Sequence, residues 1–320
     1  MKNCLVTGGA GFVGGHVVRG LLQRGQNVRV LDNLSTGKAQ NLDDVRSDIE
    51  FIAGDICDPQ TCADAMKGID TVFHLAARAS VPRSIEFPVE TNQANVTGTI
   101  NLLLAARDEG CSRFVYSASS SAYGDTPTLP KIETMTPNPL SPYAVSKLAA
   151  EHYCHAFANV YGMQTISLRY FNVFGPRQDP NSAYAAVIPA FVTRMVRGEQ
   201  PVIYGDGEQT RDFCFVDNVV AANLQAATTE GVSGEVVNIG CGERTSLNSI
   251  VHEINRHLGT RLAPMYQPGR PGDVRDSLAS IDAAKRIIGY TPQVFFAEGL
   301  ERSIAWYREH AEKAEATSAR

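Results

Sequence analysis

Short apolar runs alternate with longer stretches of helical periodicity through the first half of the chain. The runs are continuous and rich in Val, Ile and Phe, as buried strands are: NCLVT, NVRVL, IEFIA, TVFHLA, RFVYSA and TISLRY. Helical patterns lie between and after them, at Phe12–Arg24, Pro59–Lys67, Thr91–Glu109 and Pro142–Val160. This alternation predicts an α/β fold of the Rossmann type, a doubly wound parallel sheet with helices on both faces.

The rhythm changes after FNVFGPRQDP, where strands no longer alternate cleanly with helices. Glycine and proline become frequent, and the segments GPRQDP, YGDGEQT and YQPGRPGD are typical of irregular connections. We therefore expect two interleaved domains: residues 1–175 forming the sheet, and residues 176–320 forming mainly a smaller C-terminal substrate domain. A segment near 235–240, VVNIG, is expected to return to the sheet.

Three glycines follow the first predicted strand in TGGAGFVG. Gly8, Gly11 and Gly14 form G-x-x-G-x-x-G, a variant of the turn that brings the backbone and a helix N-terminus close to a dinucleotide pyrophosphate. The second predicted strand ends at Asp32, where a carboxylate should bind the adenosine ribose and repel a 2′-phosphate. The pattern therefore predicts NAD rather than NADP, with Asp55 of GDI and the small residues of HLAA also near it.

A tyrosine and a lysine lie four residues apart in SPYAVSK. Tyr143 and Lys147 share one face of the helix that is predicted to begin at Pro142. A lysine ammonium and a cationic nicotinamide ring both favour the phenolate, so we expect a lowered pKa for Tyr143 and a role as base. Ser119, at the end of the fifth predicted strand, could hydrogen-bond the same substrate oxygen. The pair alone favours a helical tyrosine beside a solvated lysine with no catalytic role; together with the cofactor turn upstream, it favours catalysis.

Composition narrows the classes of partner. The formal net charge of −5 over 320 residues gives no electrostatic footprint for nucleic acid or an anionic membrane. No apolar run approaches the roughly 20 residues of a membrane span, and the first residues give no signal-peptide pattern. The seven scattered cysteines fit a reducing compartment, and the histidines form no metal-binding pattern. We expect a cytoplasmic protein without a metal.

The motifs taken together resemble the extended short-chain dehydrogenase/reductase family, and within it the NAD-dependent sugar-nucleotide epimerases. Single motifs are weak signals, whereas their order and spacing over essentially the whole chain are specific. They are TGGAGFVG, LDNLSTG, GDI, HLAA, NVTGT, SSSAYGD, SPYAVSK, RYFNVFGPRQ, YGDGEQTRDFCFVDNV and RPGDVRDS.

The resemblance implies roles for individual residues. The catalytic set would be Ser119, Tyr143 and Lys147. Cofactor contacts would come from Gly8, Gly11, Phe12, Val13, Gly14, Asp32, Asn33, Ser35, Gly37, Asp55, Ile56, Leu75, Ala76, Ala77, Asn95, Ser117, Tyr143, Lys147 and Tyr170. Contacts to a UDP-sugar would come from Ser119, Ser120, Tyr143, Asn172, Val187, Tyr204, Arg211, Arg270, Asp273 and Ser277.

The branches of this family share oxidation of the sugar 4-hydroxyl and differ in the next chemical step. In the dehydratases and decarboxylases of this family, at least one carboxylate residue lies in the short segment after the residue that matches Ser119. Here Ser120 and Ser121 occupy those places, and neither can act as a carboxylate acid or base. The resemblance therefore implies C4 epimerisation of a UDP-hexose. UDP-glucuronate 4-epimerase stays an alternative, as do, less strongly, a dehydratase or decarboxylase and a non-catalytic NAD-binding sensor.

The same resemblance bears on which sugar the UDP-linked substrate carries. Ser277 matches a position where a bulky tyrosine restricts related pockets to glucose and galactose, whereas a small residue admits an N-acetyl group. Serine therefore favours UDP-GlcNAc/UDP-GalNAc alongside UDP-Glc/UDP-Gal.

The family also implies a homodimer in which the helices Thr91–Glu109 and Pro142–Val160 pair across a two-fold axis, although their apolar faces could equally pack inside one subunit.

Overall fold

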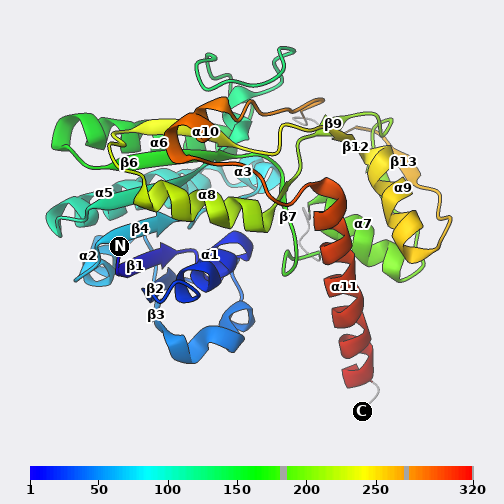
Figure 1. Cartoon of the computed structure of the whole chain (residues 1–320), viewed down its shortest axis with the longest axis horizontal. Helices are drawn as coiled ribbons and strands as arrows, with labels where there is room; N and C mark the ends of the chain where they lie inside the picture. Colours follow the sequence, from blue (N-terminus) through cyan, green and yellow to red (C-terminus); the bar gives the residue numbers. More distant parts are fainter. Residues whose placement is uncertain (181–185, 270–273, 319–320) are drawn as a thin grey trace.

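Seven parallel strands form the centre of the computed structural model, which describes residues 1–180, 186–269 and 274–318. Their order in the sheet is β3-β2-β1-β4-β5-β6-β11, and Figure 1 shows them at the core of the larger half of the molecule. The Rossmann-type fold expected from the alternating pattern is confirmed. The strands are β1 (Asn3–Thr7), β2 (Asn27–Asp32), β3 (Ile49–Ala53), β4 (Thr71–His74), β5 (Arg113–Ser119), β6 (Thr165–Tyr170) and β11 (Glu235–Ile239).

Each face of the sheet carries an apolar cluster, and successive residues of the five strands β1 to β5 enter different clusters. In β4, for example, Phe73 belongs to one cluster and Val72 to the other. The first cluster is closed by α1 (Phe12–Leu22), α8 (Val216–Thr228) and α10 (Asp282–Ile288). The second is closed by α2 (Pro59–Met66), α5 (Gly98–Asp108) and α6 (Pro142–Tyr161).

The remaining described elements connect these layers or form the smaller half of the molecule. Between β4 and α5 lie α3 (Val81–Glu86), α4 (Pro88–Asn92) and a π-turn (Gln93–Thr97), so the helical path begins before the predicted Thr91. Two 3-10 segments follow β2 and β5, at Ala39–Asp48 and Ser120–Tyr123. No helix of the described ranges is both long enough and apolar enough to span a bilayer.

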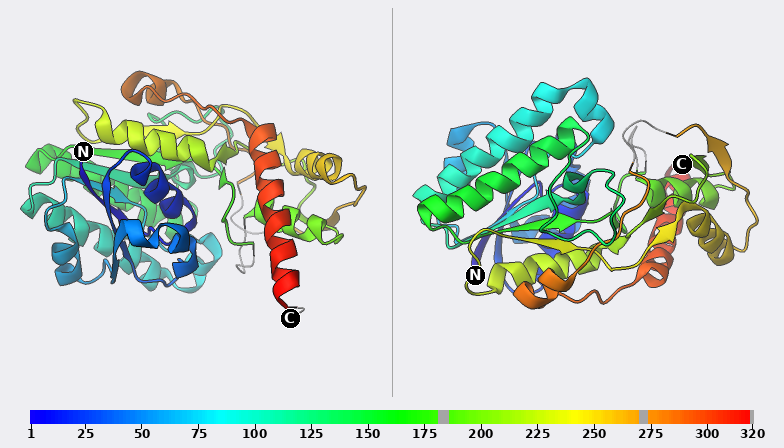
Figure 2. Two further views of the ribbon diagram at one scale, coloured as in Figure 1. Left: turned by 60° about the horizontal axis from the view of Figure 1, so that its bottom comes forward. Right: turned by 90° about the horizontal axis from the view of Figure 1, so that it is seen from above.

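A third apolar cluster holds the smaller half together. It is formed largely by α7 (Val187–Val196), α9 (Leu247–Leu258) and α11 (Phe296–Ser318). Three short strand pairs accompany it: β7 (Val173–Phe174) with β10 (Cys214–Phe215), β9 (Thr210–Arg211) with β12 (Thr245–Ser246), and β8 (Val202–Tyr204) with β13 (Met265–Gln267). Figures 1 and 2 show α11 standing at the end of the sheet, beside α7 and α9.

Candidate active site

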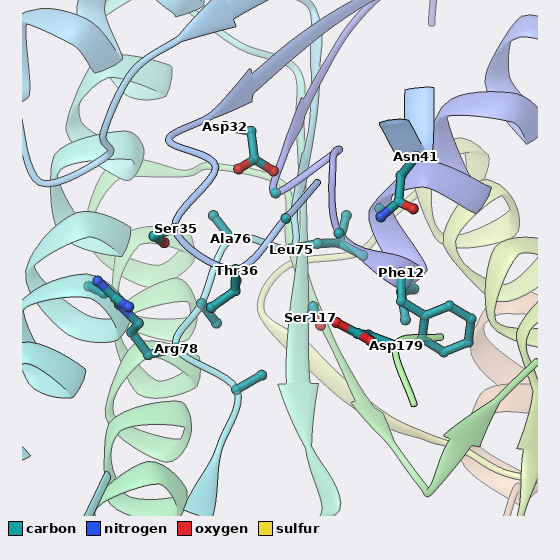
Figure 3. Close-up of a pocket in the computed structure, with 18 of the residues that line it drawn as sticks. Phe12, Asp32, Ser35, Thr36, Asn41, Leu75, Ala76, Arg78, Ser117 and Asp179 are labelled. Carbon is teal, nitrogen blue, oxygen red and sulfur yellow. The ribbon is translucent and has the colours of Figure 1, made fainter. Parts of the chain in front are cut away.

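A cavity of about 700 Å³ lies at the carboxyl ends of the central strands, which is where open α/β sheets bind ligands. Figure 3 shows Asp32 and Ser35 facing one part of it, and Phe12, Ser117 and Asp179 facing another. Of the predicted cofactor and catalytic residues, the cavity is lined by Gly8, Gly11, Phe12, Val13, Gly14, Asp32, Asn33, Ser35, Gly37, Asp55, Ile56, Leu75, Ala76, Ala77, Ser117, Ser119, Tyr143, Lys147 and Tyr170.

The glycine turn between β1 and α1 leaves no room for side chains. A Cβ on Gly14 would lie 2.1 Å from the carbonyl oxygen of Gly8, so an alanine there would force the turn open. Helix α1 begins at Phe12, and its N-cap, Gly11, offers no side chain to its first-turn N–H groups. These groups therefore stay available to a phosphate, at the positive end of the helix dipole. The cradle fits a dinucleotide pyrophosphate.

Asp32 ends β2 and braces this turn. Its carboxylate accepts hydrogen bonds from the N–H groups of Ala10 (2.9 Å) and Leu34 (2.8 Å). Burial raises the pKa of Asp32, and the two hydrogen bonds oppose the rise. A carboxylate held at this strand end fits a ribose diol and repels a 2′-phosphate.

The three candidate catalytic residues come from two elements that meet at the cavity. Ser119 is the last residue of β5, and its Oγ accepts a hydrogen bond from Ser121 Oγ (2.8 Å). Tyr143 and Lys147 lie in the first two turns of α6, which begins with Ser141 as N-cap and Pro142 in its first turn. The Tyr143 N–H donates to Ser84 Oγ (3.0 Å), which ties the start of α6 to α3.

The protein groups do not lower the pKa of Tyr143, contrary to the expectation from its spacing with Lys147. Burial raises it, and the hydrogen bond with Ser119 opposes this rise. Burial also lowers the pKa of Lys147, to about 7, because the charged ammonium is less stable there than in water. The sequence spacing gives the shared helix face, whereas the depth of burial that controls both pKa values depends on tertiary packing.

One predicted cofactor contact lies behind the cavity wall rather than on it. Asn95 is buried in the π-turn, where its Oδ1 accepts from the Arg78 N–H (2.7 Å) and its Nδ2 donates to Ser146 Oγ (2.9 Å). Arg78 itself lines the cavity. In this structure Asn95 therefore supports the loop that follows β4 and joins it to α6.

Of the predicted substrate residues that the structure describes, Ser119 and Tyr143 line the cavity, whereas the others lie outside its lining: Ser120, Asn172, Val187, Tyr204, Arg211 and Ser277. Asn172 Nδ2 donates to Ser277 Oγ (3.0 Å) and to the Asp212 carbonyl (3.1 Å). Arg211 Nη1 donates to the carbonyls of Thr210 (2.9 Å) and Arg275 (2.7 Å).

The other predicted substrate residues are more dispersed. Ser120 lies in the 3-10 turn after β5, Val187 begins α7 and Tyr204 ends β8. Arg270 and Asp273 lie outside the described residues.

Sequence reasoning missed several residues that line the cavity. Trp306 comes from α11, far along the chain. Asp179 belongs to the segment that follows β7, and its carboxylate forms an ion pair with the Lys38 ammonium at 2.7 Å. Tyr307 donates to the Gln178 carbonyl (2.6 Å) and thereby anchors that segment to α11. The full set of missed residues is Leu31, Thr36, Lys38, Asn41, Gly54, Arg78, Ala79, Ala94, Ala118, Val173, Arg177, Gln178, Asp179, Pro180 and Trp306.

Known proteins share both the sequence and the architecture of this chain. It is 38% identical to the putative UDP-glucose 4-epimerase of Methanocaldococcus jannaschii, over 96% of this chain and 98% of that one. The crystal structure of UDP-glucose 4-epimerase from Thermotoga maritima with UDP-glucose superimposes with a TM-score of 0.93 at 39% identity, covering 97% and 100% of the two chains. The UDP-N-acetylglucosamine 4-epimerase of Methanobrevibacter ruminantium, in complex with UDP-N-acetylmuramic acid, gives 0.92 at 39%, covering 97% and 99%.

The match to a family model agrees with two features of the structure, the glycine turn after β1 and the carboxylate of Asp32 at the end of β2. Residues 4–240 match the model described as the NAD dependent epimerase/dehydratase family, a span that contains every described element of the cavity except α11. The chain therefore belongs to the NAD-dependent epimerase/dehydratase family, and its cofactor is NAD.

Proposed function

We propose that this protein is a UDP-sugar 4-epimerase that inverts C4 of a UDP-hexose. The observation that carries the proposal is that Ser119, Tyr143 and Lys147 line the same cavity as the glycine turn and Asp32. A proton acceptor and a dinucleotide site therefore face one space, as oxidation of a sugar hydroxyl requires. Two structures that this chain resembles closely are 4-epimerases of UDP-glucose and UDP-N-acetylglucosamine.

The chemistry is divided among three side chains. Tyr143 accepts the proton of the sugar 4-hydroxyl at its Oη and later returns it to the same oxygen, after the keto sugar has presented its other face for reduction. Ser119 hydrogen-bonds the same oxygen, and Lys147 provides the positive charge that favours the phenolate. NAD, when bound, supplies the redox chemistry at C4.

Epimerisation is favoured over elimination because the turn after Ser119 offers no carboxylate. Ser121 instead donates its hydroxyl to Ser119 (2.8 Å), and Ser120 lies beside it in the same turn. Most of the binding energy is assigned to the nucleotide and diphosphate, which would be held by Asn172, Arg211, Arg270 and Asp273. The oxidised sugar, with few contacts of its own, can then rotate in the pocket and present its other face to the cofactor.

The proposed substrates are UDP-GlcNAc/UDP-GalNAc together with UDP-Glc/UDP-Gal; UDP-glucuronate is the alternative. Support comes from Ser277, a small buried residue whose Oγ accepts from Asn172 Nδ2 (3.0 Å). Replacing Ser277 by Tyr should lower turnover of UDP-GlcNAc about tenfold or more and spare UDP-Glc, because the ring fills space needed by the N-acetyl group. Steady-state kinetics with both sugars measures this, with Ser277→Ala as control. Equal losses on both sugars would contradict the assignment.

We further propose a homodimer formed through α5 and α6, which lie side by side in Figure 2. Support comes from an exposed apolar stripe on α6, where Val145 is 52%, Tyr153 41% and Val160 71% exposed; spacings of eight and seven residues place them on one helix face. Val160→Glu should convert the dimer to a monomer in light-scattering measurements. Met265→Glu, at an exposed apolar residue on β13, is the matched control and should leave the dimer intact. A wild-type monomer would refute the interface.

We also propose which part of the chain binds which ligand. Residues 1–175, together with the strand near 235–240, are assigned to the cofactor, and most of residues 176–320 to the UDP-sugar. A cytoplasmic location is supported by the seven free cysteines, six of them buried.

The experiment that tests the proposed reaction uses purified protein without added cofactor. UDP-GlcNAc, UDP-Glc and UDP-glucuronate are incubated separately and the products are identified by NMR. A C4 epimer from at least one of them is expected. A 4-keto-6-deoxy product or released carbon dioxide would show a dehydratase or decarboxylase, and no product from any sugar would favour a non-catalytic NAD sensor.

A further inference from the structure

A buried ion pair lies one helical turn beyond Lys147. Glu151 on α6 and Arg169 on β6 are joined by two hydrogen bonds, Nε to Oε2 at 2.9 Å and Nη2 to Oε1 at 2.7 Å. Their side chains are only 3% and 4% exposed, and among the ion pairs of the described ranges no other has both side chains so deeply buried. Burying such a pair is expensive, and apolar residues of similar size are often as stable. Its presence is therefore poorly explained by stability alone.

Arg169 extends the pair toward the serine of the active site. Its guanidinium carbon lies 4.7 Å from the ring centroid of Tyr123, which closes the 3-10 turn following Ser119. The Tyr123 hydroxyl donates to Asn238 Oδ1 (2.7 Å) on β11. Glu151, Arg169 and Tyr123 thus link the helix that carries Tyr143 and Lys147 to the turn that carries Ser119.

Glu151 also faces the charge of Lys147. Residues four apart on a helix have neighbouring side chains, and Lys147 is itself buried, with its Nζ 4.5 Å from the ring centroid of Tyr116 on β5. His74 on β4 stays neutral, because burial and Lys147 lower its pKa to about 3. Cys154 on α6 stays a thiol, because burial raises its pKa far above the usual range.

Burial lowers the pKa of Lys147, and the groups that oppose this lowering are Cys154 and Glu151. Tyr143 and Tyr116 are neutral phenols at neutral pH, since burial raises both of their pKa values. Of these neighbours, Glu151 is the acidic residue, and its carboxylate is the one paired with a buried arginine.

We propose that Glu151 and Arg169 are positioning residues for the catalytic set: the Glu151 carboxylate favours the charged form of Lys147, and Arg169 fixes that carboxylate in place and ties α6 to the turn after Ser119. The inference rests on the proposed roles of Ser119, Tyr143 and Lys147. The buried pair, although remote from the reacting atoms, would thereby control the pH range in which a positively charged Lys147 assists Tyr143.

The test is Glu151→Gln in the full-length, NAD-loaded protein. The charge of Lys147 is followed by NMR of lysine labelled with ¹³C at Cε, with its resonance assigned by its loss in Lys147→Arg. Without the carboxylate, and with Arg169 left uncompensated, the titration midpoint of Lys147 should move to lower pH by roughly one unit. The alkaline limb of the kcat profile should move in the same direction, while NAD stays bound.

Two further variants keep the test decisive. Glu151→Gln combined with Arg169→Met removes both charges and should lower the Lys147 midpoint less than Glu151→Gln alone. Glu253→Gln, which breaks the exposed pair with Arg256 on α9, should leave the midpoint unchanged.

A folded, NAD-loaded Glu151→Gln protein with the wild-type midpoint would overturn the proposal. So would failure of both the single and the double variant to fold, because the pair would then be structural. Since the midpoint is read without substrate, this result is separate from the fate of the proposed epimerase activity.

Discussion

Replacing Tyr143 by Phe should lower the turnover number by about 10³-fold and leave NAD bound. The substitution removes only the hydroxyl that is proposed to take the sugar proton, and a positioned acid or base contributes about 10²–10⁴-fold. The backbone anchor of Tyr143 to Ser84 does not involve the hydroxyl and stays in place. Turnover is measured by product NMR, and bound NAD by its release from the denatured protein.

Tyr153→Phe is the matched control for this variant. Tyr153 lies on the same helix but does not line the cavity, so loss of its hydroxyl should change neither turnover nor cofactor content. If Tyr143→Phe kept close to wild-type turnover, Tyr143 could not be the proton acceptor.

Gly8→Ala should largely abolish cofactor loading. Gly8 has φ +70°, and a Cβ there would lie 2.7 Å from the Ala76 nitrogen and 2.8 Å from its Cα. The left-handed backbone alone costs a non-glycine residue about 1–2 kcal/mol, and overpacking against a rigid strand end adds about 1–3 kcal/mol. The turn and the loop after β4 must therefore separate, which deforms the pyrophosphate cradle.

Gly25→Ala separates the two contributions. Gly25 has nearly the same φ, +68°, but an added Cβ would meet no atom within 4 Å. We expect this variant to lose only the backbone part of the stability in urea unfolding and to retain its bound NAD. Equal NAD content in the two alanine variants would show that the close contact with Ala76 is unimportant for the cofactor.

The fold was predictable because its signals are local. Alternating apolar runs and helical patterns predicted the parallel sheet, because the central strands are buried on both faces, as Val72 and Phe73 illustrate. NAD was predictable for the same reason: the glycines and Asp32 belong to one strand-turn-helix-strand unit. The family and the cofactor are confirmed; the individual catalytic and substrate contacts stay predictions.

The residues that escaped prediction depend on packing between distant segments. Trp306 and Asp179 reach the cavity from α11 and from the segment after β7, and no local pattern near either residue refers to a cofactor. The effect of burial on the pKa of Tyr143 escaped prediction for a similar reason. The spacing to Lys147 is visible in the sequence, but the burial that outweighs it is not.

The proposed mechanism requires that the hydrogen removed from C4 as hydride returns to C4 of the same sugar without exchange with water. UDP-glucose labelled with deuterium at C4 is incubated with the purified protein in ordinary water, and the product is examined by NMR. We expect UDP-galactose that keeps its deuterium at C4. A galactose product that carries solvent hydrogen at C4 would contradict it.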